Sequence, residues 1–216
     1  MQTECFDREY WQKQYGNPGQ MDGHRNAGDH VRYIQSFFDL QGIQIRWLAE
    51  FGYGYGKLLQ TICEIMQPWI AVGVEPSEYA FNQAAPFFSG IDKLSTFNED
   101  MVTWLTKEVD PGQTRNMMDL AICMGVFQYL PDDYLRRSVM LLAHHFKWLY
   151  LTAATDVDYK VMAANGYTDD YAIKRSREWY QDKIGEWFTC VGMGLWESRV
   201  IFSHATSPLR YGLYRY

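Results

Sequence analysis

The feature that most constrains this chain is a segment in which three glycines alternate with other residues: Gly52, Gly54 and Gly56. Residues 46–50 before them predict a strand, and apolar side chains recur at helical spacing after Gly56. Glycines in this pattern are unfavourable inside a strand or a helix, so they predict the turn between the two. At the carboxyl end of a parallel strand, such a turn lets a ligand lie against bare backbone near the positive end of a helix. The segment therefore predicts a ligand site.

The spacing of the glycines narrows the class of ligand. The dinucleotide fingerprint is G-x-G-x-x-G, and Lys57 stands where its third glycine would be. The phosphate-binding loop needs Ser or Thr after its lysine, but Leu58 follows Lys57. Glu50 stands at the expected strand tip, where a carboxylate can accept hydrogen bonds from an ammonium group. A nicotinamide oxidoreductase is therefore disfavoured, and a glycine turn without a ligand is the other alternative.

Composition and charge make several classes of function less favourable for this chain. A chain of 216 residues suits one domain with a sizeable core. Its net charge of −6 makes general binding to nucleic acids unfavourable, although a local basic patch is compatible with it. The four cysteines form no C-x-x-C pair, which argues against a metal site and for a reducing, cytoplasmic compartment. No secretory signal and no apolar run long enough for a membrane span is expected.

A second acid follows the next predicted strand, residues 69–75. Its uninterrupted apolar run, bounded by Pro68 and Pro76, is typical of a parallel strand buried on both faces. The strand ends at Glu75, 19 residues beyond Gly56. An acid at this tip can accept hydrogen bonds from both ribose hydroxyls of a nucleoside, and the alternative is an exposed strand-end carboxylate. Ser77 then predicts the N-cap of a helix that runs to about Phe87.

The acid and the glycines, E-x-G-x-G-x-G over residues 50–56, resemble motif I of the class I methyltransferases that use S-adenosylmethionine (SAM). The resemblance implies that Glu50 contacts the methionine end of SAM and that Glu75 binds its ribose. A weaker strand, residues 93–97, precedes Asp100 and Met101, which occupy the family's adenine-contacting places; Asp100 is equally an ordinary helix cap. The cofactor-binding residues expected in this way are Glu50, Gly52, Gly54, Gly56, Glu75, Pro76, Asp100, Met101, Cys123 and Met124.

The fourth predicted strand, residues 117–124, and the segment through Asp132 resemble motif IV of the same family. The resemblance implies substrate contact at Phe127, Gln128 and Tyr129. Many relatives carry an acid at the place of Gly125 and a Glu-His pair at the places of Gln128 and Tyr129, and this chain has neither. With no recognisable His partner, Cys123 is interpreted as a buried strand cysteine rather than a nucleophile.

The N-terminal residues also resemble this family. Residues 4–15 place Phe6, Tyr10 and Trp11 on one face of a short helix, residues 20–29 predict a mobile loop, and a second helix follows over 29–40. The F-D-x-x-Y-W pattern is similar to the N-terminal segment of many small-molecule methyltransferases. It implies a helical lid, residues 1–42, on a methyltransferase domain, residues 43–216, with Tyr10 and Trp11 contacting substrate. The alternative is that these two aromatics only pack in the core.

The remaining elements complete an α/β pattern. They are a helix over 133–145, a strand over 147–152, an irregular loop over 153–170 that is a second candidate for substrate contact, a helix over 175–185, and an antiparallel pair over 187–196 and 198–203. This order predicts a Rossmann-like, doubly wound sheet of seven strands, mostly parallel with one antiparallel strand and helices on both faces. The aromatic tail, residues 211–216, predicts either a homodimer surface or packing on the sheet edge.

The resemblance implies a SAM-dependent methyltransferase that transfers a methyl group to a small-molecule acceptor by in-line displacement. Its protein groups would mainly align the acceptor and exclude water. A general base is needed only if the acceptor holds a proton near neutral pH, and the candidates are His24 and Tyr129. The alternative is a cofactor-binding but catalytically silent partner subunit, which the missing acid at Gly125 favours.

Overall fold

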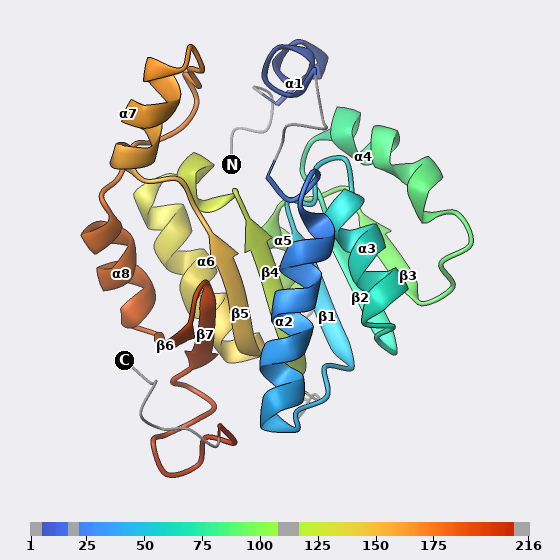
Figure 1. Cartoon of the computed structure of the whole chain (residues 1–216), viewed down its shortest axis with the longest axis vertical. Helices are drawn as coiled ribbons and strands as arrows, with labels where there is room; N and C mark the ends of the chain where they lie inside the picture. The colour runs from blue at the N-terminus through green and yellow to red at the C-terminus, as the bar shows by residue number, and fades with distance from the viewer. Residues whose placement is uncertain (1–5, 17–21, 108–116, 210–216) are drawn as a thin grey trace.

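Seven strands form one sheet in the order β3-β2-β1-β4-β5-β7-β6 in the computed structural model, which describes residues 6–16, 22–107 and 117–209 (Figure 1). The strands are β1 (Trp47–Phe51), β2 (Ile70–Val74), β3 (Leu94–Phe97), β4 (Met118–Met124), β5 (Phe146–Thr152), β6 (Phe188–Gly192) and β7 (Leu195–Ser198). Neighbouring strands from β3 to β5 pair in parallel, and β7 runs opposite to both of its neighbours. The prediction of a mostly parallel sheet with one antiparallel strand is confirmed.

Helices cover both faces of this sheet (Figure 1). They are α1 (Arg8–Tyr15), α2 (Ala27–Gln41), α3 (Lys57–Ile65), α4 (Glu78–Ala84), α5 (Met101–Lys107), α6 (Asp132–His145), α7 (Asp156–Ala164) and α8 (Arg177–Gly185), with 3-10 turns η2 (Ala85–Phe88) and η3 (Phe127–Tyr129). In β4, Leu120 and Ile122 pack with α2 and α3, whereas Ala121 and Cys123 pack with α5, α6 and α8. Successive side chains of a strand point to opposite faces of the sheet, and helices bury both faces here. The apolar run of β4 is therefore uninterrupted.

Asp119 connects three strands at the end of the sheet opposite the glycine turn. Asp119 accepts hydrogen bonds from the backbone N–H groups of Arg46 and Trp47, at 2.8 and 3.0 Å, and from Nζ of Lys147 at 2.7 Å. It therefore ties the beginnings of β1, β4 and β5 together. The histidine pair at the end of α6 lies at this same end of the sheet, as expected from the sequence.

Three boundary predictions are wrong. Residues 153–170 are not a continuous irregular loop, because Thr155 and Asp158 form a capping box that begins α7. The turn of the C-terminal hairpin lies at Gly194, whose φ of +70° reverses the chain before β7, so the second strand comes earlier than predicted. Helix α2 begins at Ala27, within the segment predicted as a loop.

The two N-terminal helices occupy different places. Val31, Ile34 and Phe38 of α2 pack in the core on the sheet, whereas α1 lies above the carboxyl ends of the strands (Figure 1). A lid over residues 1–42 stays a prediction, and α1 is the part whose position fits it. Residues 211–216, predicted as an aromatic tail, lie outside the described residues. Within the described parts of the chain, no helix has the length and apolar character needed to cross a membrane.

Candidate active site

A cavity of about 850 Å³ opens at the carboxyl ends of β1, β2, β4 and β5, beneath α1. The strand order reverses between β1 and β4, and ligands of doubly wound sheets bind outside the strands at such a point. Most of the residues predicted for the site line this cavity: Tyr10, Trp11, His24, Glu50, Gly52, Gly54, Gly56, Glu75, Pro76, Met124, Gln128 and Tyr129. The structure therefore brings together motifs that are spread over 120 positions of the chain, from residue 10 to residue 129.

The three glycines of the turn have φ angles of +69°, +57° and +76°, in the left-handed region that favours glycine. A Cβ on Gly54 would lie 3.1 Å from the ring of Trp11, and one on Gly56 would lie 2.3 Å from the ring of Phe88. A side chain at any of these positions would therefore strain the backbone, and one at Gly56 would also collide with Phe88. The turn therefore leaves bare backbone exposed to any ligand in the half of the cavity that lies above β1 and β2.

Glu50 contributes a buried carboxylate to the same half of the cavity. It is 3% exposed, and its Oε2 has no hydrogen-bond partner among the described residues. Burial, and to a lesser degree the nearby charge of Glu75, raises the pKa of Glu50 to about 8. An unpaired buried carboxylate is unfavourable unless a ligand completes it. Its position suits a cationic group such as an ammonium.

Glu75 lies at the end of β2 and links the glycine turn to α4. Its Oε2 accepts from the backbone N–H of Gly54 at 2.8 Å, and its Oε1 accepts from that of Ser77 at 2.9 Å. Burial raises its pKa to about 7, and these two hydrogen bonds oppose the rise. Each oxygen keeps a further lone pair, so the carboxylate can still accept from ligand hydroxyls. The Tyr53 hydroxyl, also buried, has no partner among the residues that the structure describes.

Four predicted site residues do not line the cavity: Asp100, Met101, Cys123 and Phe127. The carboxylate of Asp100 caps α5 through the backbone N–H of Thr103 at 2.9 Å and accepts from the hydroxyl of Tyr134. The helix-cap interpretation is therefore the one that the geometry supports. The other three side chains are buried in the core between the sheet and α5, α6 and α8, and burial raises the pKa of the Cys123 thiol.

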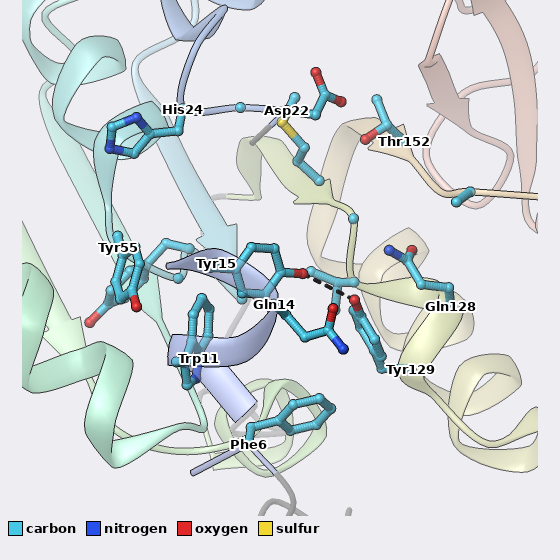
Figure 2. Close-up of a pocket in the computed structure, with 18 of the residues that line it drawn as sticks. Phe6, Trp11, Gln14, Tyr15, Asp22, His24, Tyr55, Gln128, Tyr129 and Thr152 are labelled. Atoms are coloured by element: carbon cyan, nitrogen blue, oxygen red, sulfur yellow. Dashed lines mark hydrogen bonds between the residues drawn. The ribbon is translucent and has the colours of Figure 1, made fainter. Parts of the chain in front are cut away.

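The second half of the cavity is built by hydroxyl groups around a buried acid that the sequence did not reveal. Asp169 is 2% exposed and accepts hydrogen bonds from the hydroxyls of Tyr129, at 2.8 Å, and Tyr10, at 3.3 Å. The hydroxyls of Tyr129 and Tyr15 are 3.1 Å apart (Figure 2). Asp169 stands within the loop predicted as a second substrate-contact segment, but nothing local marks it as the partner of a residue 159 positions away.

A second buried group, the guanidinium of Arg175, holds η3 in place. It donates to the carbonyl oxygens of Phe127 and Leu130, at 3.1 and 2.6 Å, and pairs with Asp132 at 2.6 Å. The turn that it holds places Gln128 against the cavity, where the amide is 6% exposed and its Oε1 lacks a partner within the described part of the chain. The sequence suggested only that Arg175 begins the last helix.

The two base candidates lie at different places in the cavity. Figure 2 shows His24 on the opposite side from Gln128 and Tyr129. Burial, followed by the charge of Lys57, lowers the pKa of His24. Burial raises the pKa of Tyr129 far above neutrality, so its phenol keeps its proton. This argues against Tyr129 as a general base and in favour of a hydrogen-bonding role.

No protein-family model matches the chain, and no curated protein matches it in sequence. Its fold is similar to the crystal structure of magnesium protoporphyrin IX methyltransferase (ChlM) from Synechocystis PCC 6803 with bound S-adenosylhomocysteine (SAH), at 13% sequence identity and a TM-score of 0.58; the match covers 91% of this chain and 96% of that one. It is also similar to the structure of the plantazolicin methyltransferase BpumL in complex with SAH, at 12% identity and a TM-score of 0.67; that match covers 85% of this chain and 72% of the other. The small RNA methyltransferase HEN1 is also similar (13%, 0.61), with 80% of this chain covering 25% of that chain. The chain therefore has the fold of the class I SAM-dependent methyltransferases.

Proposed function

We propose that the protein is a methyltransferase that uses SAM to methylate a small molecule. The observation that carries the proposal is the unpaired, buried Glu50 carboxylate beside a glycine turn at the point where the strand order reverses. An ammonium group is the kind of partner that this carboxylate lacks. The names of the structural neighbours support the same activity, since two of those methyltransferases were crystallised with SAH.

In this proposal the cofactor occupies the half of the cavity above β1 and β2. Glu50 accepts from the ammonium of the methionine moiety, the backbone from Gly52 to Gly56 lies beneath it, and Glu75 accepts from the ribose hydroxyls. Pro76 and Met124 complete the walls of this half. Asp100, Met101 and Cys123 are left out, because they do not line the cavity.

SAM supplies a methyl group on a sulfur that is already positively charged. The protein then has to align the acceptor with that methyl group and exclude water. Helix α1 suits the second task, because Nε1 of Trp11 donates to Oγ of Ser77 at 2.9 Å and this hydroxyl donates to the carbonyl of Phe6 at 2.6 Å. These contacts hold α1 against the beginning of α4, over the cofactor half of the cavity.

A small acceptor is proposed because of the shape and charge of the protein. The volume of about 850 Å³ falls in the range of pockets that enclose drug-sized molecules, and α1 covers it. The net charge of −6 disfavours a nucleic-acid acceptor. The HEN1 neighbour is named for small RNA, so a substrate screen should include RNA as a control.

Calorimetric titration with SAM, SAH and NAD tests the cofactor. We expect SAM and SAH to bind and NAD not to bind. Glu75→Ala should weaken SAM binding, and Glu78→Ala, which removes an exposed acid from the first turn of α4, should not. A folded protein that binds neither SAM nor SAH contradicts the proposal. Binding without methyl transfer to any of a broad set of acceptors would favour the silent partner subunit instead.

A further inference from the structure

Two buried acids line the half of the cavity above β1 and β2. Glu50, on β1, is 3% exposed, and Glu75, at the end of β2, is 4% exposed. No lysine, arginine or histidine of the described chain pairs with either acid. The lysines of the described lining contact other groups, since Lys13 pairs with an acid after α7 and Lys57 donates to the side chain of Gln60. Two carboxyl groups are thus buried together without the positive charge that usually accompanies buried acids.

The two carboxyl groups differ in the donors that reach them. Glu75 accepts from the backbone N–H groups of Gly54 and Ser77, and hydrogen bonds of this kind stabilise the ionised form. Oε2 of Glu50 is buried and accepts from no donor among the described residues. The cost of burying a charge is therefore offset in part at Glu75 and is not offset at Oε2 of Glu50.

The groups around Glu50 add no positive charge to it. The titratable groups that face it come from the glycine turn, α3, the end of β2 and β4: Tyr53, Cys63, Glu75 and Cys123. Burial raises the pKa values of the phenol and of both thiols, so these three groups are neutral near pH 7. The side chains that α2 buries on this face of the sheet are apolar. The charge of Lys57 acts on His24, whose pKa burial lowers first and this charge lowers further.

A buried carboxylate without a partner takes up a proton rather than keep its charge. Resting on the proposed function, we propose that Glu50 is protonated in the ligand-free protein at neutral pH and exchanges this proton for the ammonium group of the methionine moiety when SAM or SAH binds. The proton leaves Glu50 for the solvent, and the ammonium group keeps its three protons. The carboxylate that remains is then paired, as a buried charge requires.

This exchange makes Glu50 a residue that determines ligand specificity. A ligand with an ammonium group is attracted by an ionised carboxylate, whereas a ligand without one meets a neutral acid and displaces no proton. Because Glu50 must lose its proton first, affinity for an ammonium ligand should increase with pH and level off above about pH 8. Glu75 would face the ribose of either kind of nucleoside ligand, so its own proton affects both alike.

Calorimetry with SAH and 5′-methylthioadenosine tests the exchange, because the second compound keeps the adenosine part and lacks the ammonium group. Titrations at pH 7 in phosphate and in imidazole buffer, whose ionisation enthalpies differ, count the protons released. We expect SAH to release about one proton more than 5′-methylthioadenosine does, and the ratio of the two affinities to increase about tenfold from pH 6 to pH 7. Equal proton release, or a ratio that stays constant from pH 6 to pH 9, would overturn the proposal.

A substitution at Glu50 tests whether the proton comes from this residue. Glu50→Gln keeps the shape of the protonated acid and has no proton to exchange, so SAH should release no more protons than 5′-methylthioadenosine does. The ratio of the two affinities should also stay constant from pH 6 to pH 9. An extra proton that this variant still releases would assign the exchange to another group and overturn the proposal. Glu64→Gln, the same substitution at an exposed position of α3, is the matched control and should behave like the wild type.

The wild-type protein gives a second readout, which applies even if Glu50→Gln does not bind SAH. With carbon-13 at the glutamate carboxyl carbons, NMR should show a carboxyl that titrates near pH 8 without ligand and stays ionised from pH 6 to pH 9 with SAH. Glutamates that are all ionised over this range without ligand would overturn the proposal. If the wild type does not bind SAH, the proposed function fails; if it binds SAH without the extra proton, only the exchange fails.

Discussion

Glu50→Gln should stabilise the protein without ligand and weaken its binding of SAM. Glu50 is buried with Oε2 unpaired, and its pKa rises from 4.5 to about 8 on folding. A raised pKa in an acid means that the folded state disfavours the ionised form. The protonated side chain therefore leaves stability intact below pH 4.5, and stability is lost as the pH rises from there through about 8.

The size of the effect follows from the two pKa values. At pH 7 Glu50 is ionised in the unfolded chain, because this pH lies about 2.5 units above its unfolded pKa, whereas the folded chain keeps the side chain protonated. This difference lowers the free energy of unfolding at pH 7 by about 3 kcal/mol. Glutamine has the shape of the protonated acid and no charge to bury. Glu50→Gln should thus be more stable by about 3 kcal/mol at pH 7, and the difference should vanish near pH 4. Losing a charge-assisted hydrogen bond should weaken SAM binding about 10- to 100-fold.

Urea denaturation between pH 4 and pH 9, together with calorimetry of SAM binding, measures both effects. Glu64→Gln, which removes an exposed charge from α3, is the matched control and should change stability by less than about 0.5 kcal/mol. A wild-type protein that is as stable as Glu50→Gln at pH 8 would refute the reasoning. It would mean that Glu50 has a partner or reaches water in solution.

Three further predictions concern other parts of the site. Arg175→Met removes the side-chain donors to the carbonyl oxygens of Phe127 and Leu130 and should lower the free energy of unfolding by about 2–4 kcal/mol in urea denaturation; an unchanged free energy of unfolding would refute a role in holding η3. Gly56→Ala should lower the free energy of unfolding by about 1–3 kcal/mol more than Gly90→Ala does. Both glycines have a positive φ, but only a Cβ at Gly56 would meet Phe88. Equal melting temperatures of the two variants would refute this reasoning. Trp11→Phe loses one hydrogen bond to the cap of α4 and should speed SAH release about fivefold in stopped-flow experiments; an unchanged rate would show that α1 does not retain the ligand.

The fold, and the meeting of the glycine turn with the two strand-end acids at one cavity, could be predicted because their signals are local. Apolar runs that end in Glu50 and Glu75 mark two parallel strands, and glycines two apart mark a turn that other residues cannot form. These patterns depend on neighbours within a few positions. The strand order then follows from the regular alternation of strands and helices.

The part of the cavity around Tyr10, Tyr15 and Tyr129 could not be predicted in the same way, because its contacts join residues far apart in the chain. Nothing around Asp169 shows that it meets Tyr10 and Tyr129, and nothing around Arg175 shows that it holds η3. Local hydrogen bonds were also misjudged. The capping box of Thr155 begins α7 where the apolar spacing is weak, and Asp100 serves α5 rather than the cavity.

The eight-residue length of α1 has a consequence for how the cavity opens. A helix this short is not stable alone in water, so its helical form depends on its contacts with Ser77 on one side and Asp169 on the other. Release of those contacts therefore also releases the backbone hydrogen bonds of α1. We therefore expect the cavity to open through a local order–disorder equilibrium of α1, and amide exchange over residues 8–15 would measure the open fraction.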